Sequence, residues 1–185
     1  MYMYIAIFRK KENKKKVMES FDTNHNNVSV IRELGRFPEE QIIKKLKATI
    51  SNFQGTWRIY RSVNERDVNK AFKDLQIAMI RGECDASKVD SKWKSILMKP
   101  KNKLGRGKWL IDVDDPEQIV PVTDFIKDKL KEHKKVKYNE SDIEVYHTPN
   151  GFGIITPKFD TREFKFNECE IKKDALKFIE KIEVS

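Results

Sequence analysis

The sequence contains little that would support an extracellular or membrane-bound fold. Its two cysteines, Cys84 and Cys169, are too few for a disulfide framework, and their separation fits no zinc-binding spacing. No apolar run approaches the roughly 18 residues that a membrane-spanning helix requires, and no secretory signal pattern is present. The sequence therefore predicts an intracellular, cytoplasmic protein with ordinary thiols and no membrane partner.

Glycine and proline are also scarce, with 7 and 6 of the 185 residues, which excludes collagen-like and low-complexity chains. Hydrophobic residues make up 38% of the chain and charged residues 36%, a balance typical of globular rather than disordered proteins. A chain of this length can form one domain with its own hydrophobic core. We therefore expect a single domain over residues 1–185.

Positive charge is what the sequence has in excess. The 38 lysine and arginine residues against 29 acids give a net charge of +9. Such an excess attracts polyanions, because each phosphate that a protein neutralises releases condensed counterions. Nucleic acid is the partner that this composition favours, and a lysine-rich solvated surface is the alternative.

Periodic patterns predict strands that alternate with helices. Alternating apolar residues predict strands near 1–8, 26–34, 56–62, 108–114, 142–147 and 152–157. Helical spacing and first-turn residues predict helices near 38–52, 65–81, 85–99 and 116–132. Asn64 is predicted to cap the second of these helices, and Pro121 predicts a kink or a later start for the fourth. The tail from Cys169 is predicted to end a strand and lead into a final helix.

This order of elements favours a mixed α/β, or α+β, single domain. We expect the strands near 56–62, 108–114, 142–147 and 152–157 to share one mostly antiparallel sheet. The helices near 38–52 and 65–81 are expected to pack on one face of that sheet.

The stretch KWLIDVDD, residues 108–115, joins a buried strand to three carboxylates. Asp112 and Asp114 are two positions apart, so on a strand they project to the same face. Paired carboxylates at a strand end can hold one or two Mg²⁺ or Mn²⁺ ions for phosphoryl transfer. The alternative is a structural role, in which the acids end the strand and Asp115 caps the helix that begins at Pro116.

A second stretch, WRIYRSVNERD, carries groups suited to phosphate. Arg58 and Arg61 precede a predicted helix start at Asn64, and Arg66 follows it. Guanidinium groups and helix N-termini both bind phosphate. The alternative is that these arginines are ordinary surface residues.

A third stretch, HTPNGFGIITPK, predicts a hairpin whose turn is Asn150-Gly151. A tight turn of this kind exposes backbone N–H groups, and Gly151 and Gly153 allow a phosphate or a base to approach closely. A plain β-hairpin without a ligand is the alternative.

Taken together, the motifs YRSVNERD, IDVDD and TPNG resemble the catalytic core of the archaeo-eukaryotic primase superfamily. They are most similar to short primase-like proteins of large bacteriophages. The resemblance covers about residues 55–175 and leaves residues 1–54 as an N-terminal extension. It implies an RRM-like palm that carries a D-x-D metal motif, a turn-plus-histidine motif that contacts nucleotide phosphates, and a third acid on a later strand.

The resemblance assigns roles to individual residues. Asp112 and Asp114 correspond to the catalytic metal ligands, with Asp174 as the third ligand and Glu170 and Asp160 as alternatives for that position. The residues implied to bind nucleotide or phosphate are Arg58, Arg61, Asn64, Arg66, Thr148, Asn150, Gly151 and Lys158. Gly153 stands where the family has its histidine, and His147 lies on the other arm of the hairpin.

The resemblance implies a phage-type, primase-like nucleotidyltransferase of DNA replication, located in the host cytoplasm if viral. It would bind DNA or RNA, or a nucleoside triphosphate, with Mg²⁺ or Mn²⁺. A non-catalytic nucleic-acid-binding or host-interaction protein with the same fold is the alternative, supported by the missing histidine and the small size. A nuclease that uses the same acids is a weaker third hypothesis.

Overall fold

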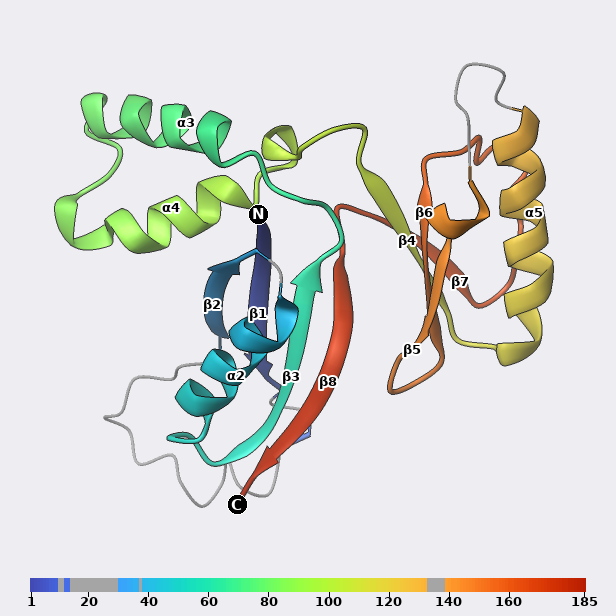
Figure 1. The fold of residues 1–185 in the computed structure, drawn as a ribbon, viewed down its shortest axis with the longest axis horizontal. Helices are drawn as coiled ribbons and strands as arrows, with labels where there is room; N and C mark the ends of the chain where they lie inside the picture. The colour runs from blue at the N-terminus through green and yellow to red at the C-terminus, as the bar shows by residue number, and fades with distance from the viewer. Residues whose placement is uncertain (10–11, 14–29, 37, 133–138) are drawn as a thin grey trace.

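The computed structural model describes residues 1–9, 12–13, 30–36, 38–132 and 139–185, which form two lobes side by side (Figure 1). The first lobe contains an antiparallel sheet with the strand order β2-β1-β3-β8. Its strands are β1 (Tyr2–Phe8), β2 (Val30–Gly35), β3 (Gly55–Ser62) and β8 (Leu176–Val184). The second lobe contains an antiparallel sheet with the order β5-β6-β4-β7. Its strands are β4 (Lys108–Val113), β5 (Glu144–His147), β6 (Phe152–Pro157) and β7 (Cys169–Lys173).

Helices cover both faces of the first sheet. These helices are α2 (Glu39–Ile50), α3 (Val68–Ile80) and α4 (Val89–Leu97). Because successive strand residues project to opposite faces, Met3 and Ile5 of β1 pack against α3 and α4. Tyr4 and Ala6 lie in the other cluster, with Leu46 of α2. The first lobe therefore has a hydrophobic core on each side of its sheet.

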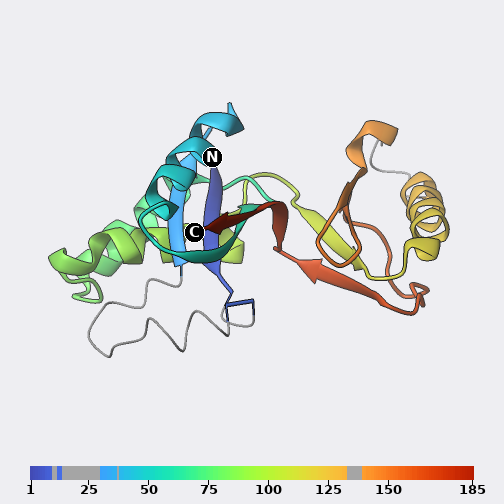
Figure 2. The same ribbon diagram turned by 90° about the horizontal axis from the view of Figure 1, so that it is seen from below.

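The second sheet is covered by a helix on one face. Val122 and Ile126 of α5 (Ile119–Glu132) pack against Ile111 and Val113 of β4 and Ile154 of β6. The opposite face of this sheet is turned toward the first lobe, and its Leu110 and Ile155 pack there with Val63. Figure 2 shows the two lobes from below, joined by the chain that runs from β7 into β8.

Short 3₁₀ turns connect these elements, at Ala86–Lys88, Pro100–Asn102, Pro116–Gln118 and Glu140–Asp142. In the described part of the chain, no helix has the length and the apolar character needed to cross a membrane.

The predicted α+β class and the antiparallel pairing are confirmed, but the prediction of a single sheet is wrong. The prediction that the helices near 38–52 and 65–81 share one face is also wrong, because α2 and α3 pack on opposite faces of the first sheet. The strand near 56–62 is β3 of the first sheet, whereas the strands near 108–114, 142–147 and 152–157 belong to the second. Periodicity reveals that a segment is a strand, but it does not reveal which strand it pairs with. Helices α3 and α4 follow β3 and pack on β1 of the first sheet. The next strand, β4, belongs to the second sheet.

The predicted final helix is also wrong, because residues 176–184 form strand β8. Phe178 pairs with Tyr60 of β3, and Ile182 pairs with Trp57. The helix-like spacing in this tail arises from a register shift in β8 opposite Ile59 and Tyr60, which interrupts the strict alternation of a strand.

Within the described residues, the four helices begin at Glu39, Val68, Val89 and Ile119, each later than the sequence predicts. Asp67, not Asn64, caps α3, since its carboxylate accepts a hydrogen bond from the Lys70 N–H at 2.9 Å. The fourth helix begins at Ile119, so Pro121 lies in its first turn, as the predicted later start requires. Residues 26–29 of the second predicted strand lie outside the described residues.

A two-residue corner joins the two sheets. Only Asp174 and Ala175 separate β7 from β8, and Asp174 adopts a left-handed backbone with φ 59°. Aspartate tolerates this conformation better than most residues that carry a Cβ. The Val63 N–H donates a hydrogen bond to the Ala175 carbonyl at 3.0 Å, which fastens the corner to the end of β3.

A buried ion pair stabilises this corner. Both terminal nitrogens of Arg66 donate hydrogen bonds to the Asp174 carboxylate, at 3.2 and 2.8 Å. The side chain of Arg66 is 0% exposed and that of Asp174 is 11% exposed. The Asn64 amide lies 3.4 Å from the same carboxylate and donates a 3.0 Å hydrogen bond to the Lys108 carbonyl. These contacts link the segment after β3 to the end of the second sheet where β4 begins and β7 ends.

We expect Asp174→Asn to lower the free energy of unfolding by about 3 kcal/mol, because it leaves the buried Arg66 guanidinium without a counter-charge. Urea denaturation of the full chain measures this loss. Asp90→Asn is the control, since the carboxylate of Asp90 pairs with Lys94 on the surface, and surface pairs contribute little. Wild-type stability for Asp174→Asn would contradict the structural role of this carboxylate.

Candidate functional site

A cleft of about 470 Å³ lies between the two lobes. The first sheet lines it with Arg58, Tyr60, Leu176 and Phe178, and the second sheet lines it with Leu110, Asp112, Tyr146 and Lys172. Asp114, which follows β4, and the turn residues Thr148 and Asn150 complete the polar rim. The cleft thus gathers acids, cations and aromatic rings from segments far apart in the sequence.

Strand alternation explains which side chains reach the cleft. In β4, Ile111 and Val113 face α5, so Leu110 and Asp112 project from the opposite face into the cleft. In β3, Trp57 and Ile59 face α2. Arg58 and Tyr60 therefore also project into the cleft. On the cleft face of the first sheet, α3 and α4 pack on β1, and side chains of β3 and β8 line the cleft. The face of the second sheet opposite α5 forms the other wall.

Asp112 is neutralised by a lysine from the neighbouring strand. Lys172 of β7 donates a hydrogen bond to the Asp112 carboxylate, and its ammonium lies 3.3 Å from the Glu170 carboxylate. Burial lowers the pKa of Lys172, but the hydrogen bond to Asp112 and the two nearby carboxylates outweigh it, and the net pKa is raised. A cation therefore already sits at the carboxylate that the sequence predicts to bind metal.

The three acids after the strand have separate roles. The Asp115 carboxylate accepts a 2.9 Å hydrogen bond from the Glu117 N–H and so caps the turn at Pro116, which confirms the predicted capping role. Asp115 therefore has the structural capping role that the sequence offered as the alternative. The carboxylates of Asp112 and Asp114 line the cleft.

Asp112 and Asp114 are the two carboxylates of the cleft that the sequence predicts as metal ligands. Among the described residues, no group of three or more histidine, cysteine or acidic side chains is placed to hold a metal ion. Asp174, the predicted third ligand, instead binds Arg66 at the corner. Mg²⁺ in nucleotide sites is commonly held by one or two carboxylates, with phosphates and water completing its shell. Asp112 and Asp114 fit that pattern.

Arg58 supplies positive charge on the opposite wall. Its side chain is only 11% exposed and forms an ion pair with Glu12. Burial lowers the pKa of Arg58, but hydrogen bonds to Tyr60 and Glu12 outweigh it and raise the pKa overall. Its Nε is buried and has no hydrogen-bond partner within the described ranges. Arg58 is thus held in place by its ion pair, and its Nε–H can still donate a hydrogen bond.

The β5–β6 turn places two polar side chains beside Asp114. The turn is closed by hydrogen bonds between Thr148 and Gly151, at 2.9 and 3.1 Å. A Cβ at Gly151 would lie 2.3 Å from the Val113 carbonyl oxygen, so only glycine allows the turn to pack this closely on the end of β4. The glycine acts by close approach, and Thr148 and Asn150 reach the cleft.

Gly153 faces the cleft directly beside Asp112, with which it pairs in register. The ring of Tyr146 covers it, and a Cβ at position 153 would lie 2.4 Å from the ring carbon Cζ. Burial, followed by the charge of Asp112, raises the pKa of Tyr146 despite its hydrogen bond to the Phe178 backbone. His147 lies on the other face of the hairpin, where its ring is 4.4 Å from that of Phe152. A phenol therefore fills the place where the resemblance implies a histidine.

Not every residue predicted for the site lies in the cleft. Arg61 is three positions from Arg58, so it faces α2 and pairs with Glu39. Asn64 and Arg66 stabilise the corner with Asp174. The structure therefore brings together Arg58, Asp112, Asp114, Thr148 and Asn150, with Gly151 shaping the turn. It places Arg61, Asn64, Arg66, Lys158 and Asp174 outside the cleft lining.

Sequence reasoning missed several residues of the cleft. These are Arg9, Tyr60, Tyr146, Lys172 and Phe178. For Tyr60 a signal was present, because it shares a strand face with Arg58. Nothing in the sequence shows that β7 lies beside β4 or that β8 lies beside β3, so Lys172 and Phe178 carried no comparable signal.

The sequence matches no protein-family model, and searches of curated proteins and of solved structures found no match. The geometry and chemistry of the cleft therefore carry the functional inference.

We expect Gly153→Ala to lower the free energy of unfolding by about 1–3 kcal/mol, because the new methyl group overlaps the Tyr146 ring. In a Tyr146→Ala background the same substitution should cost far less, since the ring is gone. A double-mutant cycle by urea denaturation measures the coupling. Additive effects of the two substitutions would show that the ring does not occupy this space.

Proposed function

We propose that the cleft binds a nucleoside triphosphate together with Mg²⁺ or Mn²⁺, and that the protein is a primase-like nucleotidyltransferase acting on nucleic acid. One observation carries the proposal. Asp112 and Asp114, predicted from sequence as metal ligands, line the same cleft as Arg58 and the Thr148–Asn150 turn. These groups come from three different segments, and each was predicted independently to serve phosphate chemistry.

Each side chain of the cleft has its own role in the proposed nucleotidyl transfer. Asp112 and Asp114 would hold Mg²⁺ or Mn²⁺, which would supply Lewis-acid chemistry at the α-phosphate. Arg58 would donate hydrogen bonds to phosphate oxygens from the facing wall. Lys172, once released from Asp112, is a second cation for the triphosphate. A 3′-hydroxyl then attacks the α-phosphate, with pyrophosphate as the leaving group.

The net charge of +9 and the resemblance to primase-like phage proteins support nucleic acid as the second substrate. A second candidate function is non-catalytic binding of nucleic acid. It is favoured by the ion pair between Lys172 and Asp112, which places a protein cation where a metal would bind.

We expect Asp112→Asn/Asp114→Asn to abolish stabilisation by Mn²⁺ and a nucleoside triphosphate. At a ligand concentration of 100 Kd, the wild type should gain about 2.7 kcal/mol of stability, roughly 5–10 °C in Tm for a chain of this size. Thermal unfolding with and without the two ligands measures the shift. Without ligands, the double variant should stay within about 1 kcal/mol of wild type, since the Lys172 pair is near the surface.

Asp115→Ala is the matched control for this experiment. Its carboxylate caps the turn at Pro116, so the variant should lose up to about 1 kcal/mol of stability and keep the full ligand-dependent shift. Equal shifts in the wild type and the double variant, or none in either, would contradict the assignment of the metal ligands.

We expect Lys172→Met to bind Mn²⁺ about tenfold more tightly than the wild type in the absence of nucleotide, because it removes an ammonium that competes for Asp112. Isothermal titration calorimetry measures this affinity. Lys173→Met is the matched control, since Lys173 is the next residue and lies over the Trp109 ring. An unchanged or weaker Mn²⁺ affinity for Lys172→Met would show that Lys172 does not compete with a metal.

A further inference from the structure

Three aromatic side chains line the cleft beside its charged groups. These are Tyr60, Tyr146 and Phe178, which we call the aromatic wall. Tyr60 and Phe178 are paired in register on β3 and β8, and their ring centroids lie 5.8 Å apart at 75°. Tyr146 lines the same cleft from the second sheet. The wall therefore spans both lobes.

Tyr60 and Phe178 contribute to none of the hydrophobic clusters formed by the described residues. Both rings are half-buried, and their mutual contact and the cleft are their main surroundings. Tyr146 differs, since it packs against the cluster of Val63, Leu110 and Ile155 that joins the lobes. Two large aromatic rings are thus half-buried in a polar cleft and lie outside the hydrophobic clusters.

The wall lies next to the groups that would hold phosphate. Arg58 precedes Tyr60 by two residues on the same strand face, and both side chains line the cleft. Asp112 lies close to the wall, because it pairs in register with Gly153, which the Tyr146 ring covers. A ligand with a triphosphate at one end and a flat aromatic group at the other matches this arrangement.

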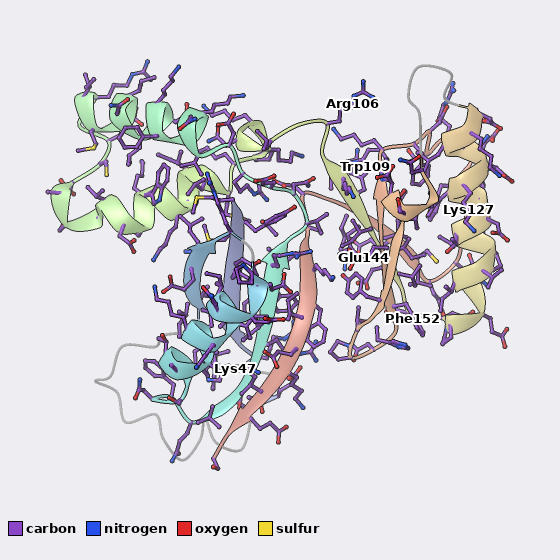
Figure 3. The ribbon with its side chains drawn as sticks, viewed as in Figure 1. Lys47, Arg106, Trp109, Lys127, Glu144 and Phe152 are labelled. Carbon is purple, nitrogen blue, oxygen red and sulfur yellow. The ribbon has the colours of Figure 1, made fainter. Side chains whose placement is uncertain are left out.

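The chain holds Glu144 and Lys177 beside the wall. Glu144 of β5 projects toward the first lobe (Figure 3), where it forms an ion pair with Lys177 of β8. The Lys177 ammonium also lies 5.1 Å from the centre of the Tyr146 ring. These contacts hold β5 against β8 and fix the spacing of the two lobes at the wall.

We propose that the aromatic wall binds the base of the nucleoside triphosphate by stacking, with little discrimination among bases. This inference rests on the proposed function of the same cleft. Stacking tolerates any base, because every base has a π-face.

The test compares ligands that share a triphosphate and differ in the base. Isothermal titration calorimetry with Mn²⁺ and the full chain measures Kd for ATP, GTP, CTP, UTP and inorganic triphosphate. We expect all four nucleotides to bind at least about tenfold more tightly than inorganic triphosphate, and to lie within about tenfold of one another.

Substitutions in the wall identify the source of that difference. Tyr60→Leu and Phe178→Leu should each remove most of the advantage of the nucleotides and leave the affinity for inorganic triphosphate unchanged. Tyr60→Phe is the matched control, since it keeps the ring and should retain the advantage. Urea denaturation verifies that each variant is folded.

The outcomes separate this inference from the proposed function. Equal affinities of the wild type for nucleotides and for inorganic triphosphate would overturn the base site while the metal and phosphate site stands. An equal loss for both ligand types in the leucine variants would assign the rings a structural role and also overturn it. Binding of neither ligand in the presence of Mn²⁺ would overturn the proposed function and the inference together.

Discussion

The corner between β7 and β8 is the constraint on which the rest of the structure depends. Asp174 and Ala175 alone carry the chain from the second sheet to the first, so the two sheets cannot separate without breaking this corner. The buried Arg66 guanidinium binds the Asp174 carboxylate from the segment after β3. Burying an ion pair contributes little net stability, but removing one partner leaves an uncompensated charge. The main effect of the ion pair is therefore to determine where the two lobes meet, and its net contribution to the free energy of unfolding is small.

Once the lobes are fixed, strand alternation determines the chemistry of the cleft. The second sheet buries one face against α5, and the side chains of its other face meet those of β3 and β8 across the cleft. On one wall these are Arg58 and Tyr60, and on the other they are Asp112 and Lys172. The acids and cations neutralise one another across short distances, as the ion pair of Lys172 with Asp112 shows. In the proposed complex, the metal ion would take the place of Lys172 beside Asp112, and the triphosphate would become the new partner of the Lys172 ammonium.

The sequence predicted local elements well and partners in space poorly. The hairpin at Asn150-Gly151, the helices and the D-x-D strand follow from short-range patterns, and the structure contains them. Asp112 and Arg58 could be predicted as site residues because their types and positions suit phosphate. Alternation places Arg58 and Arg61 on opposite faces of β3, but the sequence does not show which of these faces is covered by α2. The sequence therefore could not show that only Arg58 lines the cleft. The role of Asp174 depends on a contact 108 residues away along the chain, which no local pattern encodes.

The most direct test of the account is a crystal structure of the protein with Mn²⁺ and a non-hydrolysable nucleoside triphosphate. Anomalous scattering locates Mn²⁺ without reference to the protein coordinates. The account predicts a Mn²⁺ peak bound by the carboxylates of Asp112 and Asp114, with the Lys172 ammonium displaced from Asp112 and the triphosphate within hydrogen-bonding distance of Arg58. A nucleotide bound outside the cleft, or a Lys172–Asp112 pair that persists with no Mn²⁺ beside it, would contradict the account.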